Sequence, residues 1–297
     1  MKTKAITSIK LPASVASCLL KAELGMRRLR IDEFLSRDLY DPSMHLLKKK
    51  GKLLRPGLIF VGAYVLGERP SHFVNLAIAA ELLHVSSLIH DDIIDGDMKR
   101  RDAAAVHVKY GQEAAILAGD ALISKAIALS SEYGAKVMQA ITRSTMEMCA
   151  GETIDYGYQK RKKVPNVREY TNIAALKSAS LIGTCCNIAA VYKGSPLAGR
   201  MYNMGRDLGI AFQIRDDILD YAAHGKGSSG DGFRPNIVTT IMRQSDMGHT
   251  SALTRAIRLN NFYIDRAINR MDAGRIRSTM ADYAGFIRVD PAAILKQ

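Results

Sequence analysis

Six aspartates in two apolar stretches are the residues whose spacing first indicates chemistry in this chain. Each stretch has the pattern DDxxD, and the members are Asp91, Asp92, Asp95, Asp216, Asp217 and Asp220. On a helix, residues i and i+4 share one face about 6 Å apart, so the first and last carboxylates of each pattern converge. Such a pair repels itself unless a cation lies between, and hard oxygen ligands suit Mg²⁺. We therefore predict two magnesium-binding clusters, although either pattern alone would also fit a solvated, acidic helix end.

The surroundings of both patterns favour a partly buried, functional role. Apolar residues flank each one, in SSLIHDDIID and in FQIRDDILD. Buried carboxylates need partners, because an isolated charge is costly away from water. Metal ions could be those partners, or the nearby Arg100, Arg101 and Arg215 could simply neutralise the clusters.

If the two clusters face each other across a helical bundle, they would hold several Mg²⁺ ions with a diphosphate between them. A diphosphate also needs fixed cations. The candidates are Lys52, Arg55, Arg100, Arg101, Lys177 and Lys226. Each of these alone is more often a surface charge, so only their combination with the aspartates favours a binding role.

The composition is typical of a helical protein with a phosphorylated or anionic partner. The 297 residues are 47% hydrophobic, with 13 Met and no Trp, which suits a core of Ala, Leu and Ile. The formal net charge of +13 invites nucleic acid, an anionic membrane surface or phosphorylated substrates. We expect no nucleic-acid partner, because no zinc-finger spacing, RNP-like sequence or long basic tail is present.

Hydrophobic periodicity predicts an all-helical chain that forms one domain over residues 1–297. Helices are expected over residues 14–37, 113–129, 135–159 and 196–223, with another that starts after Pro70 and carries the first acidic cluster. Residues 167–191 are expected to form one helix or a helix pair. A turn is expected at Asp41-Pro42, and the Gly- and Ser-rich residues 225–232 form the clearest loop.

The cysteine pattern favours a cytoplasmic protein. Cys18, Cys149, Cys185 and Cys186 show no CxxC spacing, so we expect buried free thiols in a reducing compartment. The N-terminal residues lack a sustained apolar region and a small-residue cleavage pattern, so we expect no signal peptide. We also expect no transmembrane segment, since no apolar stretch of about 18 residues is free of charge or strong polar interruption.

Several motifs together resemble those of the trans-type isoprenyl (polyprenyl) diphosphate synthases. They are GKLLRP at 51–56, ELLHVSSLIHDDIIDGDMKRR at 81–101, LAGDAL at 117–122, GE at 151–152, LKSASL at 176–181 and GIAFQIRDDILDY at 209–221. They occur in the family's order and cover residues 45–235. The combination is far more specific than a single DDxxD.

The resemblance implies a fold, a cofactor and a reaction. The fold is the all-α isoprenoid synthase fold, a helical bundle around a deep central cavity with two facing Asp-rich helices. The cofactor is Mg²⁺, with three ions in each site. The reaction is head-to-tail condensation of isopentenyl diphosphate with an allylic diphosphate such as dimethylallyl, geranyl or farnesyl diphosphate.

The resemblance also assigns residues to roles. Isopentenyl diphosphate would be held by Gly51, Lys52, Arg55, His84 and Arg101. The allylic diphosphate would be held by Arg100, Lys177, Gln213 and Lys226, and the catalytic residues would be Lys177, Ser178, Gln213 and Lys226. Metal would be bound by Asp91, Asp95 and Asp216, together with Asp92, Asp217 and Asp220. His84 also fits a core histidine bonded to a backbone carbonyl.

Product length would be set by residues upstream of the first cluster. In this family bulky aromatic residues there are associated with short products, whereas Ser86 and Ser87 are small. Leu83 is the next candidate obstruction along the helix. We therefore expect an all-trans product of C20 or longer.

Two departures from the family pattern leave alternatives open. The loop after Asp220 looks short, and Asn236 stands where a lysine often follows. A regulatory subunit of a heteromeric synthase is therefore an alternative. A class I terpene cyclase is another, although DDILD at 216–220 and KLLR at 52–55 argue against it. The family also implies a homodimer, for which the apolar helix at 113–129 could supply an interface, and a basic surface could contact a membrane peripherally.

Overall fold

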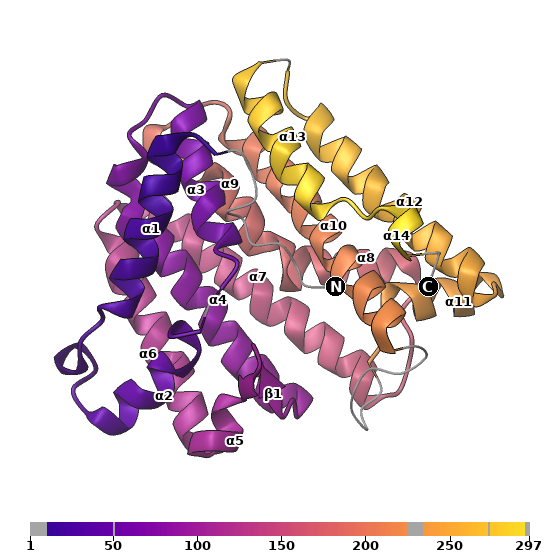
Figure 1. The fold of residues 1–297 in the computed structure, drawn as a ribbon, viewed down its shortest axis with the longest axis horizontal. Coiled ribbons are helices and arrows are strands. Elements are labelled where there is room, and N and C mark those ends of the chain that lie inside the picture. Colours follow the sequence, from indigo (N-terminus) through magenta and orange to yellow (C-terminus); the bar gives the residue numbers. More distant parts are fainter. Residues whose placement is uncertain (1–10, 50, 225–233, 273, 295–297) are drawn as a thin grey trace. The chain divides into compact units, whose positions relative to one another are not determined.

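The computed structural model describes residues 11–49, 51–224, 234–272 and 274–294, which are almost entirely helical, as predicted (Figure 1). The first elements are α1 (Ala13–Arg27), the 3₁₀ turn η2 (Ile31–Phe34), α2 (Arg37–Leu47), α3 (Leu54–Val65), the 3₁₀ turn η3 (Pro70–Phe73), α4 (Val74–Asp95), β1 (Lys99–Arg100), β2 (Ala103–Ala104), α5 (Val106–Tyr110) and α6 (Gln112–Ser131). The remaining ones are α7 (Ala135–Lys160), α8 (Val167–Lys177), α9 (Ala179–Lys193), α10 (Ala198–His224), α11 (Ile237–Ser245), α12 (His249–Asn269), α13 (Arg275–Ile287) and α14 (Pro291–Ile294).

The chain divides into two compact units, each of which carries one acidic cluster. Unit 1 comprises Met1–Ala140 with Ile188–Lys193, and unit 2 comprises Ile141–Asn187 with Gly194–Gln297. Helices α7 and α9 therefore contribute to both units. The expectation of a single domain over residues 1–297 stays a prediction.

In unit 1, helix α4 is packed by α1, α3, α5 and α6. Most of its apolar side chains are buried, and those of Leu76 and Ile89 are fully so. Helix α6 approaches α4 closely at Gly119, where an added Cβ would lie 2.1 Å from the Nε2 atom of His90. Helix α4 stops after the first acidic cluster because Gly96 adopts a left-handed conformation with φ of 68°. The cluster thus lies at the C-terminal end of a rigid, buried helix.

In unit 2, helix α10 packs against α8, α11, α12 and α13 (Figure 1). Its buried face includes Met204, Leu208 and Ile218, and it carries the second acidic cluster one turn before its end. Helix α9 approaches α10 at Gly209, where an added Cβ would lie 2.5 Å from the Cα atom of Ala179. The close contact fixes α10 relative to the break between α8 and α9.

A short hairpin follows the first acidic cluster, and no periodicity in the sequence predicted it. Strands β1 and β2 pair antiparallel, with Arg100 opposite Ala103. The two turn residues, Arg101 and Asp102, have φ values of 53° and 59°. Positive φ at both turn positions matches the right-handed twist of a hairpin, although glycine or asparagine is the usual occupant. Arg100 ends β1 and Arg101 begins the turn, and the two side chains reach different carboxylates, Asp92 and Glu81.

Two local predictions near the N-terminus are wrong. The expected turn at Asp41-Pro42 lies inside helix α2, which begins at the cap Ser36, whose Oγ accepts from the Leu39 amide at 3.2 Å. A proline in this position removes one backbone donor, and the short helix survives that loss. The expected helix over residues 14–37 ends at Arg27 and is followed by η2.

The expectation that no helix could span a membrane is also wrong when the helices are judged by length and composition alone. The segments 70–95 and 112–131 are long and apolar enough, and the bent pair α8–α9, with a 49° bend, would make a third. The expectation required an uninterrupted apolar stretch, whereas these segments reach a high mean hydropathy although they contain charged residues such as Glu81, Asp120 and Lys125. In the first segment 67% of the most apolar window is buried inside the structure, so packing explains its composition, whereas in the second only 33% is buried.

Candidate active site

The first acidic cluster occupies the last turn of α4 in unit 1. Asp91 and Asp95 are partly exposed. Asp92, which lies between them in the sequence, is fully buried. The C-terminal end of a helix carries a partial negative charge, so three carboxylates there require nearby cations. The fold supplies the first of these through the hairpin.

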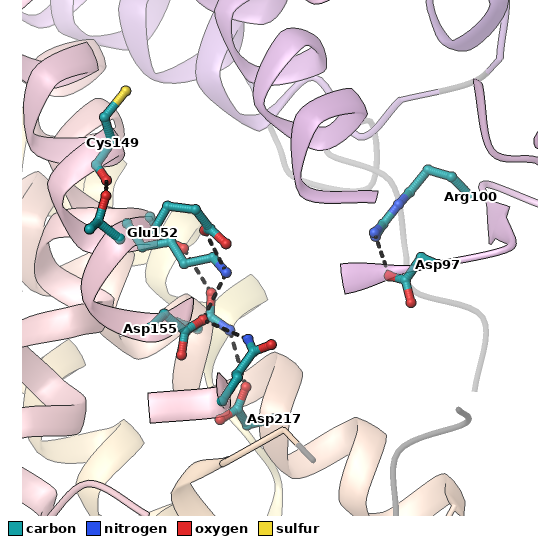
Figure 2. Close-up of polar contacts among 11 residues, drawn as sticks. Asp97, Arg100, Cys149, Glu152, Asp155 and Asp217 are labelled. Carbon is teal, nitrogen blue, oxygen red and sulfur yellow. Dashed lines mark hydrogen bonds and ion pairs between the residues drawn. The ribbon is translucent and has the colours of Figure 1, made fainter. Parts of the chain in front are cut away.

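Arg100 is the counter-ion of Asp92. Its Nε atom donates to Asp92 Oδ1 at 2.7 Å, and its Nη2 atom donates to Asp97 Oδ2 at 2.9 Å (Figure 2). Burial raises the pKa of Asp92, and the bond and charge of Arg100 oppose that rise. Asp92, predicted as a metal ligand, and Arg100, predicted as a diphosphate ligand, are therefore paired with each other here.

Arg101 points to a second carboxylate, Glu81, which is buried on α4. The ion pair measures 3.7 Å, and Arg101 also donates to the carbonyl of Leu46 at 3.4 Å. Burial raises the pKa of Glu81, while the charges of Arg55 and Arg101 lower it. Gly51 closes this group, because a Cβ there would lie 3.2 Å from Glu81 Oε1 and 3.4 Å from Arg101 Nη1.

His84 marks the centre of a cationic group in unit 1. Its pKa is held well below the usual value, first by burial and then by the charges of Arg55, Arg101, Arg100 and Lys52. The charges of residues assigned to isopentenyl diphosphate thus act on one neutral histidine, and we call Lys52, Arg55 and Arg101 the cation cluster. Lys52 and Arg55 do not share a helix face, since Leu53 has a left-handed φ of 50° and α3 begins only at Leu54.

The product-length positions lie one to two turns before the first cluster. Leu83 is buried. Ser86 is also buried, and its hydroxyl donates to the Gly119 carbonyl of α6 at 3.0 Å. Ser87 is partly exposed and donates to the carbonyl of His84 at 2.9 Å. Of the two serines, only Ser87 has exposed surface where a larger side chain could extend.

The second acidic cluster, in unit 2, is arranged differently. Asp216 is paired with Arg215 at 3.1 Å, and Asp220 is exposed. Asp217 accepts hydrogen bonds from the Tyr170 hydroxyl at 2.6 Å, from the Gln213 side-chain amide at 3.1 Å and from the Ile237 backbone amide at 2.9 Å. Burial is the largest influence on Asp217 and raises its pKa to about 6, against these three donors.

Gln213 joins this cluster to the break between α8 and α9. Ser178 lies at the break and donates to Gln213 Oε1 at 2.8 Å. Both ends of the Gln213 carboxamide are therefore bonded, one to Ser178 and the other to Asp217. Ser178 and Gln213, both predicted as catalytic residues, are thus connected in unit 2.

Lys177, at the end of α8, is clamped by two carboxylates of α7. Its Nζ atom lies 2.7 Å from Glu152 and 2.9 Å from Asp155 (Figure 2). The helices meet closely because residue 151 is glycine, where an added Cβ would lie 2.3 Å from the Lys177 amide nitrogen. All four cysteines are free thiols, but the expectation that they are buried is wrong for Cys149, which lies one turn before Glu152 and is exposed.

The remaining predictions concern the segment after α10. Lys226 and the predicted loop at 225–232 lie outside the described residues, which resume at Arg234. Asn236, which replaces the lysine of the family pattern, caps α11 by accepting from the Thr239 amide at 2.9 Å. The asparagine at position 236 therefore has a helix-capping role that a lysine could not fill.

Sequence reasoning missed five residues that contact the predicted site residues. They are Glu81, Asp97, Glu152, Asp155 and Tyr170. Helical spacing offered a signal for two of them, since Glu81 is three residues from His84 and Tyr170 is seven residues from Lys177. The other contacts depend on which helices pack together.

Known proteins resemble this chain over most of its length. The polyprenyl synthetase family model matches residues 36–243. The geranylgeranyl diphosphate synthase of Methanosarcina mazei is 37% identical over 205 residues, which are 65% of this chain and 63% of that protein. The chain is thus matched over slightly less than two thirds of that relative's length.

Two further relatives extend the match. The heptaprenyl diphosphate synthase component 2 of Geobacillus stearothermophilus is 28% identical over 83% of this chain and 88% of its own length. The solved geranylgeranyl pyrophosphate synthetase of Geoglobus acetivorans is 26% identical, with a TM-score of 0.78 over 92% of this chain and 97% of that one. The all-α fold is therefore the isoprenoid synthase fold, and the chain belongs to the polyprenyl synthetase family.

Proposed function

We propose that this protein is a trans-prenyltransferase that condenses isopentenyl diphosphate head-to-tail with an allylic diphosphate. The observation that carries the proposal is that the charges of Lys52, Arg55 and Arg101 act on His84 of helix α4, which also bears the carboxylates Asp91 and Asp95 two turns further on. An anion site beside α4 and a metal site at its end are thus both within unit 1. The family match favours this activity over a class I terpene cyclase.

The cation cluster suits a diphosphate that binds without metal. Arg55 and Arg101 present planar groups that match phosphate oxygens, and Lys52 adds a point charge. Buried Glu81 holds Arg101 in place beneath them. We assign isopentenyl diphosphate to this cluster, with Gly51 leaving room because it has no side chain.

The residues present fit Mg²⁺ by the chemistry of their donors. No group of three or more His, Cys, Asp or Glu able to hold a metal alone is found among the described residues. Mg²⁺ does not require one, since it keeps several waters and uses one or two carboxylates with substrate phosphate oxygens. Asp91 and Asp95 in unit 1 and Asp216 with Asp220 in unit 2 have exposed surface for this role.

The reaction needs charge stabilisation rather than a nucleophilic side chain. Breaking the allylic carbon–oxygen bond leaves negative charge on the departing diphosphate, and Mg²⁺ when bound supplies positive charge there. Lys177 adds a fixed cation once a diphosphate competes with Glu152 and Asp155 for its Nζ atom. The Ser178 and Gln213 dipoles then face the allylic cation, and the released diphosphate accepts the final proton.

We infer a product of C20 or longer, which needs space beyond the first cluster. Small Ser87 has exposed surface at the start of that space, and the relative from Methanosarcina mazei is a geranylgeranyl diphosphate synthase. We further propose a cytoplasmic homodimer that contacts membranes at most peripherally. Exposed Ile116, Leu117 and Ile127 on α6 support a dimer interface.

A second candidate is a subunit of a heteromeric synthase. The observation in its favour is the match over 88% of a protein named as component 2 of a heptaprenyl diphosphate synthase. The altered segment at Asn236 fits such a specialised chain as well.

One assay separates these functions. Purified protein is incubated with labelled isopentenyl diphosphate, each allylic primer and Mg²⁺, and the products are resolved by chromatography. Elongation to C20 or longer supports the synthase, whereas no turnover of a folded protein supports the subunit. A cyclised hydrocarbon would contradict both. Ser87→Phe should shorten the product, and an unchanged product length would contradict the assigned tunnel.

A further inference from the structure

Among the described residues, Asp217 accepts its hydrogen bonds from neutral donors, whereas Asp216 is paired with Arg215. Its Oδ2 atom accepts from the Tyr170 hydroxyl and from the Ile237 amide, and its Oδ1 atom accepts from Gln213. These three donors come from helices α8, α11 and α10, respectively. Both carboxylate oxygens are thus directed at the protein itself.

The bond to Gln213 determines how that carboxamide is oriented. A glutamine side chain has one accepting and one donating end, and the two are set by the network around them. Asp217 accepts from Nε2, which leaves Oε1 to accept from Ser178. Without the carboxylate this network would not fix the amide, because the Ser178 hydroxyl can donate to Oε1 or, after a half-turn of the amide, accept from Nε2.

The bond to Ile237 determines where α11 begins. Ile237 is the first residue of α11, and its amide is one of the four that an α-helix leaves without an internal partner. A carboxylate at this position also favours the positive end of the helix dipole. Together with the Asn236 cap, Asp217 anchors the chain where it returns after residue 233.

We propose that Asp217 and Tyr170 are positioning residues that hold the Gln213 carboxamide and the start of α11, and that Asp217 is not a metal ligand. This inference rests on the proposed function, because it assigns them to the step in which Gln213 faces the allylic cation. Metal binding in this cluster is left to Asp216 and Asp220. Tyr170 acts on Gln213 only through Asp217.

The first test is kinetic and uses the full chain. Asp217→Asn should lower kcat about 10- to 100-fold, because the amide is misplaced. The KM for isopentenyl diphosphate and the Mg²⁺ concentration for half-maximal rate should stay within about twofold. Asp216→Asn should instead raise the Mg²⁺ requirement. A shift in Mg²⁺ requirement for Asp217→Asn similar to that for Asp216→Asn would overturn the proposal.

A double-mutant cycle tests whether Asp217 acts through Gln213. The variant with both Asp217→Asn and Gln213→Ala should be no slower than Gln213→Ala alone, within about twofold. Multiplying effects would show independent roles and overturn the proposal. If Asp217→Asn fails to fold, Tyr170→Phe replaces it in the same double-mutant cycle, because this substitution removes only one hydroxyl.

The matched control for Tyr170→Phe is Tyr202→Phe. Tyr202 lies on α10 and donates to the Glu147 carboxylate at 2.9 Å, so the same type of bond is lost in the same unit. Tyr202→Phe should leave kcat unchanged. An equal fall in kcat for both variants would mean that the Tyr170 effect is only structural.

A readout without substrate separates this inference from the proposed function. Exchange of the Gln213 side-chain amide hydrogens is followed by NMR, with the signal assigned by its absence in Gln213→Ala. Asp217→Asn should speed exchange, and Tyr202→Phe should not. Unchanged exchange would overturn the proposal even if the enzyme is active, and faster exchange would support the contact even if no elongation is found.

Discussion

The two acidic clusters share one spacing, but the negative charge of the central aspartate is compensated differently in each. Asp92 in unit 1 is fully buried and is paired with the guanidinium of Arg100. Asp217 in unit 2 is held by a hydroxyl, an amide side chain and a backbone amide, all neutral. An identical DDxxD motif therefore does not imply an identical electrostatic environment.

The difference extends to the residues around each cluster. In unit 1 the charges of four cations lower the pKa of His84. In unit 2 Lys177 is paired with Glu152 and Asp155, so a ligand that uses its charge must compete with them. On the proposed function, unit 1 suits a bare diphosphate, and unit 2 suits one that brings its own cations.

The largest effect is expected for Arg100→Met, which leaves Asp92 buried without its cation. Breaking a buried pair by removing one partner costs about 3–5 kcal/mol. Urea denaturation of the variant should therefore show that loss in the free energy of unfolding. Adding Asp92→Asn should recover part of it, whereas Lys99→Met, on the exposed neighbour, should have little effect. A loss below about 1 kcal/mol would contradict the charge-paired description of unit 1.

A smaller effect is expected for Tyr170→Phe in unit 2. One hydrogen bond to a carboxylate is lost while two neutral donors remain, which costs about 1.5–3 kcal/mol. The same denaturation experiment measures this loss of unfolding free energy, and Tyr202→Phe is the reference variant. A loss larger than that for Arg100→Met would reverse the comparison between the units.

His84 should make the stability of the chain depend on pH. Its pKa in the folded protein is held well below the unfolded value of about 6.5, so only the unfolded chain binds a proton as the pH falls. The free energy of unfolding should therefore decrease below about pH 6.5, by up to about 1.4 kcal/mol per pH unit from this residue. His84→Asn should flatten the slope between pH 5 and 7, roughly the range where unfolded histidine titrates.

Inorganic diphosphate provides the control for this pH dependence. If it binds to the cation cluster, it offsets the charges that lower the pKa of His84 and should flatten the slope of the wild-type protein. The same slope in His84→Asn and wild type would show that the cluster does not act on this histidine.

The smallest effect is expected for Asn236→Ala at the start of α11. Loss of the cap bond to Thr239 should cost about 1 kcal/mol of unfolding free energy. Asn236→Gly should cost only a few tenths, roughly, because glycine is tolerated at this position. Equal losses for both variants would indicate that Asp217, rather than Asn236, anchors this helix.

Much of the fold could be predicted because apolar periodicity alone defines long helices. Helix α6 was expected at 113–129 and covers Gln112–Ser131, and α7 was expected at 135–159 and covers Ala135–Lys160. The hairpin at 99–104 could not be predicted, because its strands have two residues each and its turn uses Arg101 and Asp102 rather than glycine.

The roles within each cluster could be predicted only in part. Adjacent helical residues point about 100° apart, so the sequence indicates that Asp91 and Asp92 face different surroundings. It does not indicate that the second one meets Arg100. The same holds for Ser86 and Ser87, of which only the first contacts α6. These assignments depend on neighbouring helices whose packing no local pattern encodes.

The exposed thiol on α7 makes the native sequence a ready-made spectroscopic probe. Cys149 lies three residues before Glu152, and the other cysteines are buried and therefore shielded from labelling. A fluorophore attached there would sit one helical turn from the carboxylates that clamp Lys177. Rapid-mixing fluorescence could then time the release of that lysine on ligand binding, without any engineered residue in the chain.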